Sequence, residues 1–269
     1  NKFLLELIYG PTYAFKDYAL QFLGNLFSST LEVSPKKITI LGATSGDTGS
    51  AAIHSFKSKK DINVFILHPH NKVSPVQQKQ MTTVIDKNIF NIAVDGNFDD
   101  CQKIVKELFV DDEIQQFTSL TAVNSINWAR LIAQVVYYFW AYLQTDKDKI
   151  NFIVPSGNFG NIFSAFVAKQ MGLPIGYLHI ATNSNDILKS IVDNGEMKKK
   201  SVSQTYSPSM DIQVSSNFER QIFESLNRDS NKLNEIFETF SSKGFYQFDD
   251  SVLAKFQQIY KASSIDDSQ

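Results

Sequence analysis

Cysteine is nearly absent from this chain, because Cys101 is the only one among 269 residues. A single cysteine excludes an internal disulfide framework and suits a reducing compartment, so we expect a cytoplasmic protein. Histidine is also scarce, and the four that occur do not stand at metal-ligand spacing from Cys, Asp or Glu. We therefore expect no metal site.

An excess of charge of one sign is missing as well. The formal net charge of −2 gives no electrostatic footprint for nucleic acid. The most apolar run, residues 133–143, is interrupted by Gln134 and is too short to cross a bilayer. We therefore expect neither nucleic acid nor a membrane as a partner. The chain does have 43% hydrophobic residues, enough for a sizeable core in one large domain or two.

Short apolar segments alternate along the chain with segments of helical periodicity. This alternation predicts an α/β protein whose parallel strands are covered by helices on both faces. The expected strands are residues 38–41, 63–67, 89–94, 120–123, 151–154 and 177–181. The expected helices after the first are residues 51–57, 76–81, 98–109, 126–143 and 162–171, followed by polar helices from Asn217 and from Ser251. In such sheets ligands bind where strands lead into helices.

Lys16 stands in the first turn of a helix that is expected to begin near Pro11, with Thr12 as a possible N-cap. The positive end of the helix dipole disfavours an ammonium there by up to ~1 kcal/mol. Tyr13, Phe15 and other apolar neighbours would lower the pKa of the lysine, which a nucleophile toward a carbonyl needs. The alternative is a solvated surface lysine beside Asp17.

Residues 155–161 follow an expected strand and open an expected helix. Gly157 and Gly160 let the backbone approach a ligand, and the N–H groups point outward at the positive end of the helix. This pattern predicts an anion site, most naturally for a phosphate. It lacks the lysine of a P-loop and the third glycine of a dinucleotide fingerprint, and an ordinary tight turn remains an alternative.

Residues 42–49 repeat this arrangement after another expected strand. The hydroxyls of Thr44, Ser45 and Thr48 would suit a substrate carboxylate. Asp47 would repel an anion unless it points away or caps the helix, and a plain capped turn is the alternative.

A third polar group opens the long helix of residues 126–143. Asn124, Ser125 and Arg130 together could bind a phosphate or a carboxylate through charge-assisted hydrogen bonds. The alternative is a capped helix with an arginine on its solvent face. A lysine nucleophile with three anion-binding segments suits pyridoxal phosphate chemistry on an anionic amino acid.

Several of these segments, in this order, resemble the threonine synthase family of pyridoxal 5'-phosphate enzymes. The matching segments are residues 10–17, 42–50, 74–83, 124–130, 155–161, 181–186 and 207–220. The resemblance implies fold type II of these enzymes, with two parallel or mixed-sheet α/β domains and a cofactor cleft between them. The smaller domain is expected at residues 38–145 and the larger at 1–37 plus 146–269.

The resemblance also implies a role for each segment. Lys16 would hold the cofactor as an internal aldimine, and the cofactor phosphate would lie on Ser156, Gly157, Asn158, Phe159, Gly160 and Asn161. The substrate carboxylate would lie on Thr44, Ser45, Gly46, Asp47 and Thr48. The phosphate of O-phospho-L-homoserine would lie on Asn124, Ser125 and Arg130. The implied enzyme is a carbon–oxygen lyase that eliminates phosphate and hydrates the product to L-threonine.

The chain departs from the family at both ends. The family has a further segment before the lysine region and a C-terminal hydroxyl partner for the cofactor ring, so N- and C-terminal parts of the natural protein are expected to be missing. A monomer or a homodimer is expected. The alternatives are a related phospho-lyase that releases 2-oxobutyrate, a serine or threonine dehydratase, and a non-catalytic metabolite-binding domain.

Overall fold

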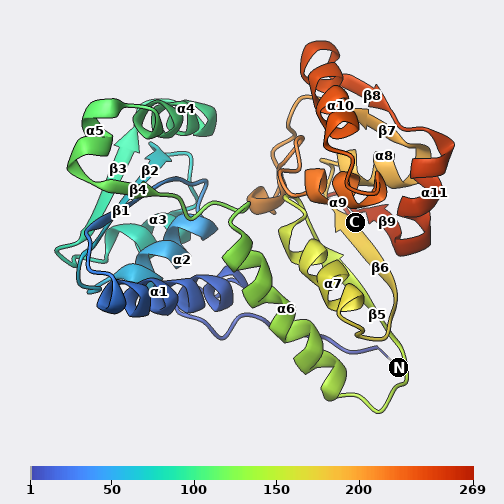
Figure 1. Ribbon diagram of the computed structural model, residues 1–269, viewed down its shortest axis with the longest axis horizontal. Coiled ribbons are helices and arrows are strands. Elements are labelled where there is room, and N and C mark those ends of the chain that lie inside the picture. The colour runs from blue at the N-terminus through green and yellow to red at the C-terminus, as the bar shows by residue number, and fades with distance from the viewer. Residues whose placement is uncertain (1) are drawn as a thin grey trace. The chain divides into compact units, whose positions relative to one another are not determined.

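A computed structural model describes residues 2–269 and divides into two compact units. The first ends at Ala133, and the second is Gln134–Gln269 (Figure 1). Each unit is an α/β structure with its own parallel sheet, as the alternation of strands and helices predicts. The domains expected at 38–145 and at 1–37 plus 146–269 are a different division of the chain, and they stay a prediction.

The first unit is built on a four-stranded sheet in the order β3-β2-β1-β4, with all neighbours parallel. Its strands are β1 (Ile38–Ala43), β2 (Ile62–Pro69), β3 (Ile89–Val94) and β4 (Ser119–Thr121). Four residues of β1 in a row are buried, as in a central parallel strand that is covered on both faces.

Helices cover both faces of this sheet. They are α1 (Lys16–Val33), α2 (Asp47–Phe56), α3 (Pro75–Thr82), α4 (Phe98–Phe109) and α5 (Asp112–Phe117). One core cluster joins α1, α2 and α3 to Ile40 and Ile66, and a second joins α4 to Leu41 and Leu67. Consecutive strand residues point to opposite faces, so these two clusters lie on opposite sides of the sheet. Cys101 is fully buried in the second cluster.

The second unit contains a three-stranded parallel sheet in the order β5-β6-β9 and an antiparallel pair, β7-β8. The strands are β5 (Ile150–Pro155), β6 (Ile175–Thr182), β7 (Glu196–Lys198), β8 (Phe245–Gln247) and β9 (Tyr260–Ser264). The helices are α7 (Gly160–Gln170), α8 (Ile187–Asn194), α9 (Phe218–Ser225), α10 (Ser230–Lys243), α11 (Asp250–Ile259) and the 3-10 turn η1 (Pro208–Met210).

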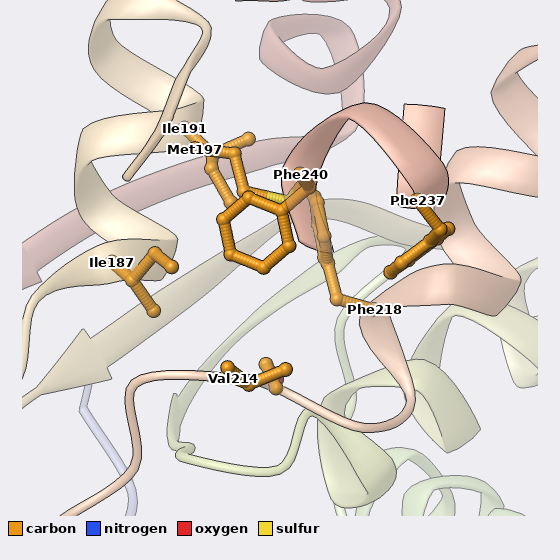
Figure 2. A pocket seen from close by; sticks show the side chains of 8 residues that line it. Ile187, Ile191, Met197, Val214, Phe218, Phe237 and Phe240 are labelled. Carbon is orange, nitrogen blue, oxygen red and sulfur yellow. The ribbon is translucent and has the colours of Figure 1, made fainter. Parts of the chain in front are cut away.

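A small cavity of about 20 Å³ lies in the core of the second unit (Figure 2). It is lined mainly by apolar side chains from α8, α9 and α10, among them Ile187, Phe218 and Phe240. A space of this size holds at most one water molecule, and the apolar walls offer a water few partners. The cavity is therefore too small for an organic ligand.

The long helix α6 (Trp128–Leu143) begins in the first unit and continues in the second. Its side chains divide into two sets: Leu131 and Val135 are buried, whereas Trp128, Val136 and Trp140 are each exposed by about half or more. Within residues 2–269, none of the helices combines the length and the apolar character that a membrane crossing needs.

Candidate active site

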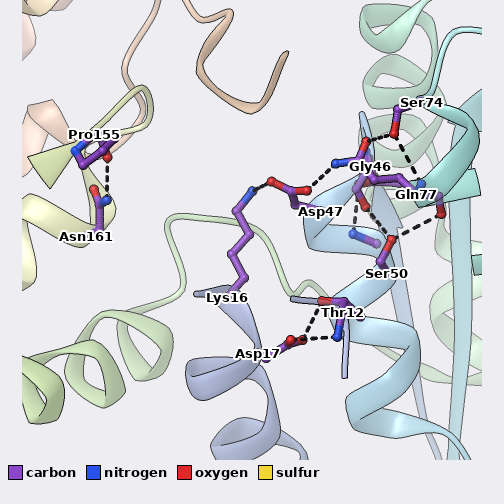
Figure 3. A network of polar contacts seen from close by, with 12 residues as sticks. Thr12, Lys16, Asp17, Gly46, Asp47, Ser50, Ser74, Gln77, Pro155 and Asn161 are labelled. Atoms are coloured by element: carbon purple, nitrogen blue, oxygen red, sulfur yellow. Dashed lines mark hydrogen bonds and ion pairs between the residues drawn. The ribbon is translucent and has the colours of Figure 1, made fainter. Parts of the chain in front are cut away.

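Lys16 is the first residue of α1, and only 15% of its side chain is exposed. Its Nζ lies 3.2 Å from Oδ2 of Asp47 (Figure 3). The neighbouring Asp17 is buried and faces Thr12, whose backbone N–H and hydroxyl donate to its two carboxylate oxygens at 2.9 and 2.7 Å. A solvated lysine beside Asp17 is therefore not what the structure contains.

Thr12 as an N-cap of α1 is a wrong prediction. The residue before the helix is Phe15, and its side chain makes no capping hydrogen bond. Thr12 is instead held by Asp17, and the segment before the helix is folded as a turn in which the N–H of Tyr13 donates to the carbonyl of Gly10. The carboxylate of Asp17 thus fixes the approach of the chain to Lys16.

Burial lowers the pKa of the Lys16 amine, and the positive charge of Arg130 lowers it further. The carboxylate of Asp47 acts in the opposite direction, through its charge and through the hydrogen bond. The net direction is downward, as a nucleophilic amine requires. Lys16, Asp47 and Arg130 therefore form one electrostatic group within the first unit.

Asp47 is the first residue of α2, but its side chain does not cap the helix, whose N-cap is Gly46. One carboxylate oxygen faces Lys16, and the other accepts a hydrogen bond from Nε2 of Gln77 on α3 (Figure 3). The carboxylate of Asp47 is thus compensated by the Lys16 ammonium and also accepts a hydrogen bond from Gln77. Sequence reasoning did not single out Gln77, because its contact with Asp47 depends on the packing of α2 against α3.

The other members of the 44–48 segment play different structural parts. Thr44 is buried, and its hydroxyl oxygen accepts from the N–H groups of Gly46 at 3.0 Å and Gly49 at 2.9 Å, so this side chain braces the loop from inside. Gly46 has φ of 147°, which L side chains rarely adopt. Ser45 is exposed and Thr48 half-buried, so their hydroxyls lie where a ligand can reach them.

A hollow of about 520 Å³ opens on the first unit next to this group. Its walls come from the segment before α1, from the start of α2 and from α3, and they include Thr12, Phe15, Asp47, Ser74 and Gln77. The volume is in the range of small-molecule sites.

Arg130, in the first turn of α6, is only 3% exposed, so an arginine on the solvent face of the helix is excluded. Its Nη1 donates to the carbonyl of Val123 at 2.7 Å. Burial lowers its pKa to about 10, which leaves it positive at neutral pH. Asn124 is exposed and Ser125 half-buried before the helix. The side chain that binds the first turn is that of Asn127, which accepts from the N–H of Ala129 and which sequence reasoning missed.

The loop of residues 155–161 lies in the second unit, between β5 and α7. Its oxygens are occupied internally: the carbonyl of Gly157 accepts from Ser215 at 2.7 Å, and that of Asn158 accepts from Asn217 at 3.1 Å. The buried hydroxyl of Ser156 donates to Oδ1 of Asn161. The amide of Asn161 in turn donates to the carbonyl of Pro155 (Figure 3). The side chains of Ser156 and Asn161, which were predicted to bind the cofactor phosphate, therefore stabilise the loop itself.

The backbone N–H groups of this loop, unlike its carbonyl oxygens, are not used by hydrogen bonds from neighbouring segments that the structure describes. Within the described part of the chain, no hydrogen bond outside the helix itself uses the N–H groups of residues 157–161. Phe159 stands in the left-handed region with φ of 63° and is fully buried against the rings of Phe218 and Tyr260. This unusual backbone conformation at the start of α7 is typical of anion-binding loops.

Gly157 has little room for a side chain, because an added Cβ would lie 3.0 Å from Cα of Met210. The segment around Met210 is held by Asp211, whose Oδ1 accepts from the side-chain amides of Asn183 at 2.8 Å and Asn185 at 3.1 Å. The asparagines thus keep this segment against the loop. These residues lie within the segments 181–186 and 207–220 that resemble the family, but no local pattern predicts their contacts.

Comparison with known proteins identifies the family. Residues 4–241 match the family described as pyridoxal-phosphate dependent enzyme. The chain belongs to the pyridoxal-phosphate dependent enzymes. The fold of this family member is that of fold type II, with α/β units built on parallel sheets, as the sequence resemblance implies.

Among relatives of this pyridoxal-phosphate dependent enzyme are proteins named threonine synthase. The one from Pseudomonas aeruginosa is 46% identical over 100% of this chain and 58% of its own length, and the one from Saccharomyces cerevisiae is 49% identical over 94% and 54%. A crystal structure of threonine synthase from Brucella melitensis, with pyridoxal phosphate bound, is 46% identical and superposes with a TM-score of 0.94 over 99% of this chain and 58% of that one. The chain thus spans a little more than half the length of these relatives.

The residues present in this pyridoxal-phosphate dependent enzyme fit the cofactor. In the second unit, the carbonyl oxygens of Gly157 and Asn158 accept internal hydrogen bonds, and the loop's N–H groups suit a phosphate. In the first unit, Lys16 offers an amine whose pKa is lowered. Among the described residues, no three His, Cys, Asp or Glu side chains gather where they could hold a metal ion.

Proposed function

We propose that this chain carries the catalytic residues of a threonine synthase, which converts O-phospho-L-homoserine and water to L-threonine and phosphate. The observation that carries the proposal is the 46% identity to the threonine synthase of Pseudomonas aeruginosa, because it extends over the entire chain. Lys16, the 155–161 loop and Arg130 therefore all lie within the matched length. The substrate class is a small phosphorylated amino acid, and the single cysteine supports a cytoplasmic enzyme.

In this proposal Lys16 is the residue that binds the cofactor and then moves protons at Cα and Cβ of the substrate. The N–H groups of Gly157, Asn158, Phe159, Gly160 and Asn161 hold the cofactor phosphate, and the Ser156 hydroxyl fixes the side chain of Asn161 within this loop. Pyridoxal phosphate, when bound, supplies an electron sink for the charge that develops on the substrate.

The substrate is proposed to be held at both of its charged ends. Its carboxylate lies on the segment from Thr44 to Thr48, on the accessible hydroxyls and on the N–H groups at the start of α2. Its phosphate lies on Asn124, Ser125 and Arg130. Arg130 is already fixed by the carbonyl of Val123, so it can stabilise the departing phosphate without reorganisation.

The first experiment tests the cofactor lysine. The full chain is incubated with pyridoxal phosphate, reduced with borohydride and digested, and the modified peptide is identified by mass spectrometry. We expect the adduct on Lys16 and none in the variant Lys16→Ala. An adduct confined to other lysines, or no adduct at all, would favour a metabolite-binding domain without catalysis.

The second experiment tests the substrate. Arg130→Ala should lower kcat/KM for O-phospho-L-homoserine by at least a hundredfold, whereas Arg228→Ala, which removes an exposed arginine paired with Glu224, should leave it unchanged. Product analysis distinguishes threonine from 2-oxobutyrate, and 2-oxobutyrate alone would replace the synthase proposal by the phospho-lyase. Equal activity of Arg130→Ala and the wild type would favour a dehydratase, which needs no phosphate site.

A further inference from the structure

A continuous chain of polar contacts extends from Lys16 into the body of the first unit (Figure 3). The Lys16 amine donates to Oδ2 of Asp47 at 3.2 Å, and Gln77 donates to the other oxygen of the same carboxylate. Ser74, the N-cap of α3, donates to Oε1 of Gln77 at 3.0 Å. Three helices, α1, α2 and α3, thus each contribute to the position of one amine.

The most obvious counter-ion for Lys16 in the sequence is Asp17, its direct neighbour. In the structure both oxygens of Asp17 are occupied by Thr12, so this carboxylate does not serve the lysine. Arg130 also acts on the amine, and because it is positive it opposes protonation. Asp47 is therefore the carboxylate that compensates the charge of the Lys16 ammonium.

Gln77 limits the freedom of Asp47. Its side-chain amide is held at both ends, by Asp47 and by Ser74, and its backbone carbonyl accepts from the hydroxyl of Ser50. A side chain at Gly46, just before Asp47, would collide with the Gln77 amide, so the two segments are in close contact. Only 23% of the Asp47 side chain is exposed. An amide held in this way keeps the carboxylate turned toward Lys16.

We propose that Asp47, oriented by Gln77, is a positioning residue that favours the ammonium form of the Lys16 amine in the chain freed of cofactor. The inference rests on the proposed function of Lys16. An ammonium is not a nucleophile, so Lys16 must give its proton to Asp47 or to solvent before its amine can react with the aldehyde of added cofactor. Asp47 thereby sets the pH range in which the free Lys16 amine reacts with added cofactor. It also fixes the position of the Lys16 side chain in the cofactor-free chain.

The reactivity of Lys16 in the full chain, freed of cofactor, tests this inference directly. The chain is labelled briefly with a small amine-acylating reagent across a range of pH, and the label on Lys16 is measured by mass spectrometry against the exposed Lys232. In Asp47→Asn the amine loses its counter-ion, so we expect it to be labelled at least tenfold faster than the wild type at pH 7. The pH profile should move to lower pH.

Two further variants separate positioning from general loosening of the fold. Gln77→Met keeps the volume but removes both hydrogen bonds, and it should move the profile in the same direction by a smaller amount. Asp17→Asn removes a carboxylate one residue from Lys16 and should leave the profile unchanged. As a second readout, the pH dependence of the rate at which added pyridoxal phosphate regains its protein-bound absorbance should shift together with the labelling in Asp47→Asn and Gln77→Met.

An unchanged labelling profile in Asp47→Asn, or in Gln77→Met if the first variant does not fold, overturns the inference. Equal shifts in Asp17→Asn and Asp47→Asn also overturn it, because the effect would then be one of net charge. The proposed function fails in a different way, namely when borohydride traps no cofactor on Lys16 of the wild type. Trapping on Lys16 with an unchanged profile rejects the positioning role alone.

Discussion

The buried pair of Thr12 and Asp17 leads to a stability prediction that can be worked out from the structure. Asp17 is fully buried and accepts two hydrogen bonds, from the N–H and from the hydroxyl of Thr12. A hydrogen bond to a charged group contributes about 1.5–3 kcal/mol, and a buried N–H left without a partner carries its own penalty. Asp17→Ala should therefore lower the free energy of unfolding by about 3–5 kcal/mol.

Asp17→Asn is the matched control because it preserves the shape. The amide oxygen can still accept from the N–H of Thr12, and the amide NH₂ can donate to the Thr12 hydroxyl, so only the charge assistance is lost. We expect a cost of about 1 kcal/mol. In urea denaturation followed by circular dichroism, with a slope of ~2 kcal/mol per M, Asp17→Ala should lower the midpoint by roughly 1.5–2.5 M. A shift below 0.5 M in this scheme, or equal shifts for both variants, would refute the reasoning.

Four more predictions follow from single contacts. Phe159→Ala, at a fully buried ring, should lower the free energy of unfolding by about 3–5 kcal/mol in the same assay, and a loss below 1 kcal/mol would contradict the packing described. Gly157→Ala places a Cβ 3.0 Å from Cα of Met210, so the dissociation constant of the cofactor, measured by absorbance titration, should rise about tenfold. Inhibition by inorganic phosphate should weaken at least tenfold in Arg130→Ala, because the buried cation proposed to bind phosphate is then removed, and an unchanged inhibition constant would exclude Arg130 as its site. Cys101 is fully buried and its thiol pKa is raised by burial, so a thiol reagent should react with it only after unfolding.

Local periodicity in the sequence was sufficient to predict much of the fold. The helix at 98–109 and the strand at 89–94 have the observed bounds, because the helix has a strong amphipathic repeat and the strand is a short, mainly apolar run between polar residues. The end of the helix before Gly172 was predicted to within a residue or two. The α/β class with parallel sheets is confirmed by the strand pairing.

The elements that were missed have physical reasons. Helix α10 contains the local signals, with Asp229 accepting the first N–H groups and Gly244 ending the helix in the left-handed region, but its many polar residues obscure the repeat. Strand β9 is a polar segment that becomes a strand only by pairing with β6, some eighty residues earlier in the chain. Pairing over such a distance has no local signature.

The candidate site shows the same division. Lys16, the 155–161 loop and Arg130 were chosen because residue type and position relative to a helix start restrict their chemistry. The partnership of Asp47 with Gln77 was not foreseen, because it depends on contact between two helices. The inward orientation of Thr44 was likewise not foreseen, because a hydroxyl in a loop can face either the ligand or the loop's own N–H groups.

The pairing of β9 with β6 has a consequence for biosynthesis. On the ribosome, β6 is complete long before its neighbour Tyr260–Ser264 emerges, so one edge of an apolar strand waits without a partner while more than seventy residues are added. Such an open edge can pair with other nascent chains. A stop codon just before Tyr260 would make this interval permanent, and the shortened product should accumulate in inclusion bodies.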